Sequence, residues 1–316
     1  MTDTTYYVVL NANAGTANAT GVTAQSLAEL FETNGLTATI DADTDQSMDD
    51  RIAKGLASPA QTIVAAGGDG TITAVAAGLV GSDKTMGILP LGTVNALAKD
   101  LGIPLALEAA VAALANSHVQ RIDVGEVNGK IFLHKVVIGL IPGMAAGREH
   151  IRGRYDAAAK LGFMRYFFRR IARSRRIAIA ISADGGPTRV ERVQALAVAS
   201  NAYDEGFGQF FHRQSLDRGT MTLYVLKHFT VRDFLRLTSG MLIGRWQRDE
   251  ALDVTSVGTV TIASHKSLLK VMFDGEVMSL NTPLEFRIRP LALAVMVPQA
   301  ANAPVAELPL APTGTE

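Results

Sequence analysis

Cysteine is absent from this chain of 316 residues, and tryptophan occurs once. Without cysteine the protein has no disulfide, no thiol nucleophile and no thiolate metal ligand, a composition that suits a reducing cytoplasm. The six histidines show neither an H-x3-H nor an H-E-x-x-H spacing, so zinc chemistry is not expected. Thiol enzymes and disulfide scaffolds are therefore excluded at the outset.

An excess of one charge and long apolar runs are also lacking. The chain has 30 Lys and Arg residues and 30 Asp and Glu residues, so no overall field favours nucleic acid. No apolar run approaches the roughly 20 residues that span a bilayer, and the first residues lack the basic and apolar regions of a signal peptide. We therefore predict a cytoplasmic protein that is soluble or, at most, attached to a membrane surface.

Strand and helix patterns alternate in the first part of the chain. Apolar strands are predicted near residues 6–10, 36–41, 61–66, 86–90 and 119–124. Helices are predicted near residues 21–34, 47–57, 71–80 and 94–116, the last broken at Pro104. This alternation predicts a doubly wound α/β domain over residues 1–125, in which ligands bind at the carboxyl ends of the parallel strands.

From about residue 126 the pattern becomes β-rich. Short runs are found at 130–138, 176–183, 192–200, 220–227, 258–263, 268–274, 283–289 and 292–297. Helices interrupt them near 155–173 and 230–243. We predict an antiparallel β-sandwich domain over residues 126–290. The Ala- and Pro-rich residues 299–316 are predicted to be a disordered tail.

A glycine-rich turn follows the third predicted strand. It consists of Gly67, Gly68, Asp69, Gly70 and Thr71. Glycines allow a close approach of the backbone to a ligand, and the N-terminus of the next helix offers N–H groups to a phosphate. An acid in this position would repel phosphate unless it handled a metal ion or a proton. The turn predicts phosphate chemistry with Asp69 as a working group; the alternative is a structural turn in which Asp69 caps the helix.

Two further motifs also follow predicted strands. The strand ending at Pro90 leads into Gly92-Thr93-Val94-Asn95, where Thr93 is placed to cap a helix. The strand Leu268–Phe273 leads into Asp274-Gly275-Glu276. Asp-Gly by itself is a strong hairpin signal, so a purely structural turn is the alternative here.

Taken in order, these motifs resemble the diacylglycerol kinase catalytic-domain family, which also contains sphingosine and ceramide kinases. A turn with Asn11, Asn13 and Gly15 loosely matches the opening motif of that family, and the four motifs extend the resemblance from residue 6 to about 298. The resemblance implies an N-terminal doubly wound α/β domain of the phosphofructokinase/NAD-kinase type, which binds nucleotide, followed by an antiparallel β-sandwich that binds lipid. It also implies that the last strand, near 291–298, returns to the first domain.

The resemblance further implies a site for ATP and Mg²⁺ between the two domains. The residues that it brings to the nucleotide are those of the glycine-rich turn together with Asn11, Asn13, Gly15, Thr44, Thr93 and Asn95. Asp274 would serve the metal network, and either Asp69 or Glu276 would take the proton of the lipid hydroxyl. Asp69 is slightly favoured because it lies in the phosphate loop. Asp123 matches an acidic position of the family and is a candidate metal ligand.

Two departures from the family pattern bear on the substrate and on a second metal. Ala96 stands where many bacterial members carry an acid, and Asn95-Ala96-Leu97-Ala98 is closer to the sphingosine kinases. Diacylglycerol and a ceramide or sphingoid base are therefore both expected acceptors. In Asp217-Arg218-Gly219 a cation replaces one acid, which weakens the structural metal site that Asp217 would serve. NAD kinase activity and an inactive lipid- or nucleotide-binding module are the alternative functions.

One segment is strongly basic. Residues 148–176 contain nine arginines and Lys160 against only Glu149 and Asp156, interleaved with aromatic residues. This composition suits an anionic bilayer, where each basic residue contributes about 1 kcal/mol. No nucleic-acid motif accompanies it, so we predict no nucleic-acid partner. The expected partners are a lipid substrate and the inner membrane face, with a homodimer left open.

Overall fold

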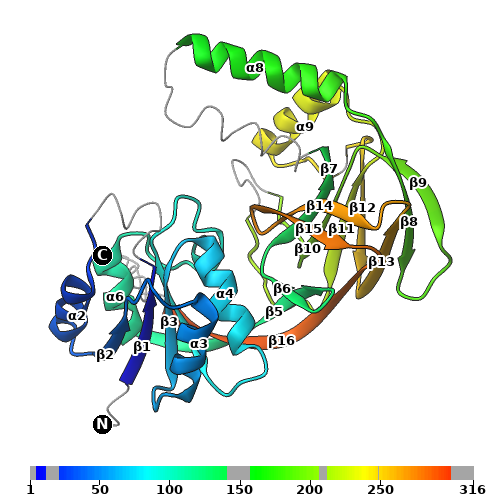
Figure 1. The fold of residues 1–316 in the computed structure, drawn as a ribbon. Coiled ribbons are helices and arrows are strands. Elements are labelled where there is room, and N and C mark those ends of the chain that lie inside the picture. The colour runs from blue at the N-terminus through cyan, green and yellow to red at the C-terminus, as the bar shows by residue number, and fades with distance from the viewer. Residues whose placement is uncertain (1–4, 12–20, 141–156, 206–211, 248, 300–316) are drawn as a thin grey trace, which may run out of the picture.

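The computed structural model describes residues 5–11, 21–140, 157–205, 212–247 and 249–299. Figure 1 shows two lobes: a helix-flanked lobe formed by the first part of the chain, and a β-rich lobe formed by the middle and later parts. Two long strands, β5 (Ser117–Val127) and β16 (Leu284–Pro298), run between them.

The first lobe contains a parallel sheet. Its strands are β1 (Thr5–Leu10), β2 (Thr37–Asp41), β3 (Thr62–Gly67) and β4 (Thr85–Pro90), in the order β2-β1-β3-β4. Its helices are α2 (Ala24–Thr33), α3 (Met48–Ala57), α4 (Asp69–Leu79), α5 (Ala96–Asp100) and α6 (Leu107–Ala115). The central strands β1, β3 and β4 are almost wholly buried, as expected for parallel strands covered on both faces. The predicted doubly wound class is confirmed.

The second lobe is an antiparallel sandwich, as predicted. One sheet has the order β12-β11-β10-β7-β14-β15, formed by β12 (Leu252–Val257), β11 (Met221–Leu226), β10 (Ala195–Ser200), β7 (Lys135–Gly139), β14 (Leu268–Phe273) and β15 (Glu276–Asn281). The facing layer contains β6 (Lys130–Phe132), β8 (Ile177–Ala183), β9 (Arg189–Val193) and β13 (Thr259–Ser264). Ile181, Val198 and Ile262 belong to the shared core between the layers.

Several strand predictions were wrong in detail. The run 130–138 is two strands, β6 and β7, and the run 192–200 joins the end of β9 to β10. Strands β12 and β15 were not predicted. Both are edge strands of their sheet and each buries only one side chain, Val257 and Leu280, so neither has the apolar pattern by which a strand is recognised.

Strand β16 belongs to both lobes. Its first residues, Leu284–Arg287, pair antiparallel with β13, whereas Val295 pairs parallel with Met86 of β4. Strand β5 pairs with both halves of β16, and the register shifts between Arg289 and Leu293. The two predicted runs 283–289 and 292–297 are thus one irregular strand. A single ten-stranded sheet therefore passes through the whole molecule.

Two helices cover the outer end of the second lobe. They are α8 (Ala157–Ala172) and α9 (Val231–Ile243). Phe234 of α9 packs against Phe167 and Phe168 of α8, with ring centroids 4.9 and 5.9 Å apart. In the described residues, no helix combines the length and the apolar character needed to cross a bilayer.

Candidate active site

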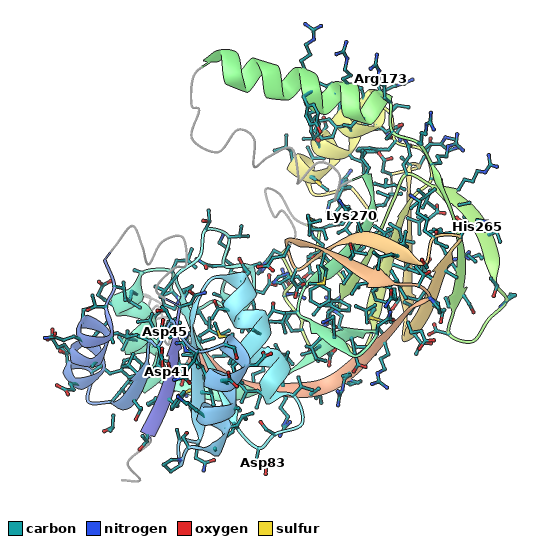
Figure 2. The ribbon with its side chains drawn as sticks, viewed as in Figure 1. Asp41, Asp45, Asp83, Arg173, His265 and Lys270 are labelled. Atoms are coloured by element: carbon teal, nitrogen blue, oxygen red, sulfur yellow. The ribbon has the colours of Figure 1, made fainter. Side chains whose placement is uncertain are left out.

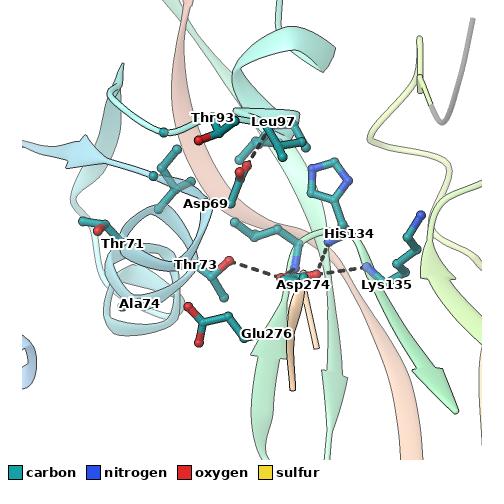
Figure 3. A pocket seen from close by; sticks show the side chains of 18 of the residues that line it. Asp69, Thr71, Thr73, Ala74, Thr93, Leu97, His134, Lys135, Asp274 and Glu276 are labelled. Carbon is teal, nitrogen blue, oxygen red and sulfur yellow. Dashed lines mark hydrogen bonds between the residues drawn. The ribbon is translucent and has the colours of Figure 1, made fainter. Parts of the chain in front are cut away.

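A cavity of about 880 Å³ lies between the two lobes. The first lobe lines it with the glycine-rich turn and with residues between Gly92 and Asp100. The second lobe contributes Leu133–Lys135, Tyr203, His212 and the turn Asp274–Glu276. Figure 3 shows how these groups converge from helices on one side and strands on the other. The motifs that lie far apart in the sequence therefore share one cavity.

Two glycine turns form the wall of the cavity in the first lobe. A Cβ atom placed on Gly92 would lie 2.7 Å from the Cα atom of Gly68, so the two backbones approach too closely for any side chain. The Leu91 N–H donates to the Gly67 carbonyl at 2.9 Å and holds the turns together. Gly68 precedes the first turn of α4 without a side-chain cap. The N-terminal N–H groups of α4 are thus available to an anion.

Asp69 links these two turns. Its carboxylate accepts the Asn95 N–H at 3.0 Å and the Ala96 N–H at 2.7 Å, and it therefore caps α5 from a different element (Figure 3). The predicted cap by Thr93 was wrong: Thr93 is exposed, and Asn95, with a φ of 50°, precedes the helix. Asn95 bonds back to the N–H and carbonyl of Gly92 at 2.9 and 2.8 Å. Both carboxylate oxygens of Asp69 are engaged by the backbone.

Asp274 begins the hairpin turn between β14 and β15. The residues Asp274 and Gly275 have φ angles of 45° and 100°, so the turn is the one that Asp-Gly predicts. Asp274 accepts the N–H groups of three consecutive residues, Leu133, His134 and Lys135, at 2.7, 2.9 and 3.0 Å. It also accepts the Thr73 hydroxyl at 3.2 Å. Burial raises the pKa of Asp274, against the opposing effect of these hydrogen bonds.

Glu276 differs from the other two acids. It is exposed to the cavity, and its carboxylate accepts no hydrogen bond from any residue that the structure describes. Its Oε1 atom would lie 2.7 Å from a Cβ placed on Gly70, next to the glycine-rich turn. Glu276 is therefore a carboxylate with open lone pairs beside the glycine-rich turn.

A buried basic cluster completes the cavity, and the sequence motifs did not reveal it. Arg213 has only 1% of its surface exposed and pairs with Asp100 at 2.7 Å. Burial, followed by the charge of Arg213, holds the pKa of His134 well below its usual value and lowers the pKa of Lys135 to about 8. Lys135 lies 5.0 Å from the ring centroid of Tyr203. These residues belong to no local motif, because they meet only in the folded chain.

Asn11 and Thr44, predicted near the nucleotide, differ in their position. Asn11 lines the cavity and donates from Nδ2 to the Thr71 hydroxyl at 2.9 Å. Thr44 is exposed in the turn before α3, and Met48, the first residue of that helix, lines the cavity instead. Asn13 and Gly15 lie outside the described residues.

Asp123 joins two segments of the chain through backbone hydrogen bonds. Its carboxylate accepts the Gly219 N–H at 2.6 Å and the N–H of Leu291, at the irregularity of β16, at 2.8 Å. Asp217 is exposed and accepts the Ser215 hydroxyl at 2.7 Å. Within the described part of the chain, no group of three or more His, Asp or Glu residues could hold a metal ion. The geometry therefore gives no support to the predicted metal roles of these two residues.

Comparison with known protein families assigns the chain to a class of protein. A family model described as "Diacylglycerol kinase catalytic domain" matches residues 5–127. A second, "YegS C-terminal NAD kinase beta sandwich-like domain", matches residues 143–297. The chain belongs to this family, and it is a kinase.

Individual relatives agree with this membership. A "Diacylglycerol kinase" of Bacillus subtilis (strain 168) is 31% identical over 225 residues, which are 68% of this chain and 70% of the relative. A "Probable lipid kinase YegS-like" of Pseudomonas aeruginosa (strain PAO1) is 31% identical over 262 residues, 82% of each chain. A crystal structure of a diacylglycerol kinase from Bacillus anthracis str. Sterne superimposes with a TM-score of 0.71, at 20% identity, over 95% of this chain and 99% of that one.

Proposed function

We propose that this kinase transfers the γ-phosphate of ATP to the hydroxyl group of diacylglycerol. One observation carries the proposal. The uncapped N-terminus of α4, which suits phosphate, and the open carboxylate of Glu276, which suits a hydroxyl proton, come from different lobes and meet in one cavity. Phosphoryl transfer mostly requires such positioning of charged groups.

The residues of the first lobe fit a nucleotide. The approach of Gly68 to Gly92 leaves backbone rather than side chains on this wall, so phosphate oxygens can reach the N–H groups of α4. Asn11 and Thr71, joined by a hydrogen bond of 2.9 Å, supply polar side chains next to the same turn. We propose that ATP phosphates bind here.

Asp69, whose two oxygens each accept a single N–H, would hold Mg²⁺ when nucleotide is bound. Mg²⁺ generally takes one or two carboxylates and fills its other positions with phosphate oxygens and water, so a cluster of three acids is not required. When bound, the ion neutralises charge on the phosphates. Asp274 is less suited to this role, because its oxygens already accept three N–H groups and a hydroxyl.

We assign the role of base to Glu276 rather than to Asp69. A base needs a lone pair within reach of the acceptor proton. Glu276 is open to the cavity, whereas each oxygen of Asp69 accepts one backbone N–H and would give its other lone pair to Mg²⁺. In the proposed step the lipid oxygen forms a bond to the γ-phosphorus, the bond from that phosphorus to the bridging oxygen of ADP breaks, and the hydroxyl proton moves to Glu276.

The test is transfer of label from γ-labelled ATP, with Mg²⁺, into micelles that contain diacylglycerol, ceramide or a sphingoid base. A fourth reaction contains NAD and no lipid. We expect label in diacylglycerol, and a loss of about a hundredfold or more in Glu276→Gln. Glu285→Gln, an exposed acid on β16, is the matched control and should retain activity.

The other outcomes are equally informative. Label in ceramide or a sphingoid base would replace diacylglycerol as the acceptor, whereas label in NAD would overturn the lipid assignment. Full activity of Glu276→Gln together with an inactive Asp69→Asn would return the role of base to Asp69.

We also propose that α8 and α9 dock on an anionic bilayer. Exposed arginines on α8 and just after it are Arg165, Arg169, Arg173, Arg175 and Arg176, and Figure 2 shows Arg173 at the outer end of the second lobe. The neighbouring α9 exposes the apolar residues Leu235, Leu242 and Ile243, at 55%, 50% and 62%. Basic and apolar groups side by side suit a charged lipid surface. Residues 148–156 of the predicted basic segment lie outside the described residues.

Sedimentation with lipid vesicles tests this docking. The wild type should bind phosphatidylglycerol vesicles and bind phosphatidylcholine vesicles weakly. The double variant Arg169→Glu/Arg173→Glu should lose about tenfold or more in affinity, since each basic residue contributes about 1 kcal/mol. Arg192→Glu, an exposed charge on β9, is the control. Equal binding by all three proteins would refute the proposed surface.

A further inference from the structure

Hydrogen bonds join two helices and two loop segments around the cavity into a closed ring, which we call the circuit. The circuit runs through Asp69, helix α5, Asp100, Arg213, the segment Leu133–Lys135, Asp274, Thr73 and helix α4, and so returns to Asp69. It crosses from one lobe to the other twice, once through Arg213 and once through Thr73. Most of its members line the cavity.

The arc in the first lobe is short and rigid. Asp69 lies in the first turn of α4 and holds the start of α5 through the Ala96 N–H. Helix α5 has five residues and ends at Asp100. Asp69 therefore binds the start of α5, and Asp100 at its end reaches the boundary between the lobes. The short helix connects the phosphate-binding turn to that boundary.

Arg213 makes the first crossing, and its guanidinium is fully used. Nε and Nη2 donate to Asp100 Oδ2 at 2.9 and 2.7 Å. Nη1 donates to the carbonyls of Leu133 and Ser200 at 2.7 and 2.9 Å, and Nη2 also meets His134 Nε2 at 3.1 Å. Because a guanidinium has no acceptor, His134 accepts this bond at Nε2. The low pKa that burial and Arg213 give His134 agrees with this. The five N–H groups of an arginine thus join one acid of the first lobe to the link between β6 and β7 and to the end of β10 in the second.

Asp274 and Thr73 make the second crossing. The segment Leu133–Lys135 is held by Arg213 at the Leu133 carbonyl and by Asp274 at three successive N–H groups. Asp274 then accepts the hydroxyl of Thr73, which lies on α4 close to the glycine-rich turn. Glu276 stands two residues beyond Asp274, so its location relative to that turn is set by this circuit.

We propose that Arg213 and Asp100 are positioning residues for phosphoryl transfer: through the circuit they fix the hairpin that carries Glu276 against the phosphate-binding turn before any substrate binds. This inference rests on the proposed function. A misplacement of about 1 Å can cost about a hundredfold in rate. The nucleotide contacts proposed above lie in the first lobe alone, so their loss is not expected when the circuit opens.

The kinetic test compares Arg213→Lys with Arg218→Lys. Arg218 lies in the same loop but is exposed and pairs with Asp204 at 3.0 Å, outside the circuit. We expect Arg213→Lys to lower kcat about a hundredfold while the KM for ATP changes less than about threefold. Arg218→Lys should match the wild type. A rise in the KM for ATP with unchanged kcat, or wild-type kinetics in both variants, would overturn the proposal.

A double-mutant cycle tests whether the circuit is closed. Thr73 and Asp100 lie at opposite crossings, so the effects of Thr73→Val and Asp100→Asn on kcat would simply multiply if the two sites were independent. If the circuit acts as one unit, either substitution alone already frees the hairpin that carries Glu276. The second substitution should then lower kcat by less than a further threefold. Multiplicative effects would refute the coupling.

A third measurement needs no activity and separates this inference from the proposed function. The chain has no cysteine, so spin labels on Asp83→Cys and Lys270→Cys, exposed positions in different lobes (Figure 2), are site-specific. Without nucleotide, the distance distribution between the labels should be narrow, and it should broaden in Asp100→Asn. An unchanged distribution would overturn the positioning role. If the wild type transfers no phosphate to the lipid but Asp100→Asn still broadens the distribution, only the proposed acceptor is refuted.

Discussion

The two lobes build opposite halves of the site by different means. The first lobe presents backbone: glycine turns at the ends of β3 and β4, and the N-terminus of α4. The second presents charged side chains, Asp274, Glu276 and Lys135, on the turns and strands of an antiparallel sheet. Parallel strands lead into helix N-termini, whereas antiparallel hairpins place side chains on their turns. The first half should therefore be sensitive to added volume, and the second to lost charge.

The sharpest test of sensitivity to volume is Gly92→Ala. The new Cβ would lie 2.7 Å from the Gly68 Cα atom and 2.8 Å from Asn95 Oδ1, so the two turns must separate. We expect kcat/KM for ATP to fall by about a hundredfold or more. Gly162→Ala on α8, where nothing lies within 4 Å, should leave it unchanged. Comparable activity of the two variants would show that the contact between the turns is not required.

For the second lobe, the matching test is Asp274→Asn. An amide cannot accept at both of its atoms, so at least one of the four donors to Asp274 loses its partner. We expect urea unfolding to show a loss of about 2 kcal/mol. Asp184→Asn is the control, because Gly258 and Thr259 both donate to one oxygen of Asp184, which an amide can retain. Equal losses would mean that charge, not acceptor number, stabilises these turns.

Two buried arginines sharpen the comparison further. Arg51 pairs with Asp41 at 2.8 Å and donates to the Leu10 carbonyl, all within the first lobe. Arg213, in contrast, joins the lobes. Arg51→Lys should lower the free energy of unfolding by about 1.5 kcal/mol and leave kcat unchanged. A kcat loss as large as that of Arg213→Lys would show that any buried arginine affects catalysis.

The smallest expected effect concerns pH. Burial, followed by the charge of Arg213, lowers the pKa of Lys135 to about 8, below its ordinary value of about 10.4. Between these values the unfolded chain binds more protons than the folded one, so stability rises with pH. From pH 7.5 to 9.0 the wild type should gain about 1 kcal/mol relative to Lys135→Met, measured by urea unfolding. The same pH dependence in both proteins would contradict the lowered pKa.

The sequence revealed the first lobe better than the second. Strands β1, β3 and β4 are short, continuous apolar runs bounded by turn residues, which is how buried parallel strands are recognised. The edge strands β12 and β15 each bury one side chain and carry no such pattern. Periodicity reports burial, so it misses strands whose place is set by backbone pairing alone.

The residues of the site also fall into those that the sequence predicted and those that it did not. The glycine turns and Asp274–Glu276 were found because each is a local motif with a local physical reason. The pairing of Arg213 with Asp100, 113 residues apart in the chain, has no local signal. The cap of α5 was assigned to Thr93 because capping is usually local, whereas Asp69 supplies it from another element. Sequence patterns predict what neighbours do, and this cavity is assembled from residues that are not neighbours.

Strand β16 has a consequence for how the protein is made. It supplies the parallel partner of β4 and pairs along both halves of β5, yet it is the last strand among the described residues. A ribosome that has synthesised β1 to β5 has therefore produced a sheet whose edge stays open until more than 150 further residues have emerged. Completion of the first lobe is a late event of translation, and it coincides with closure of the second.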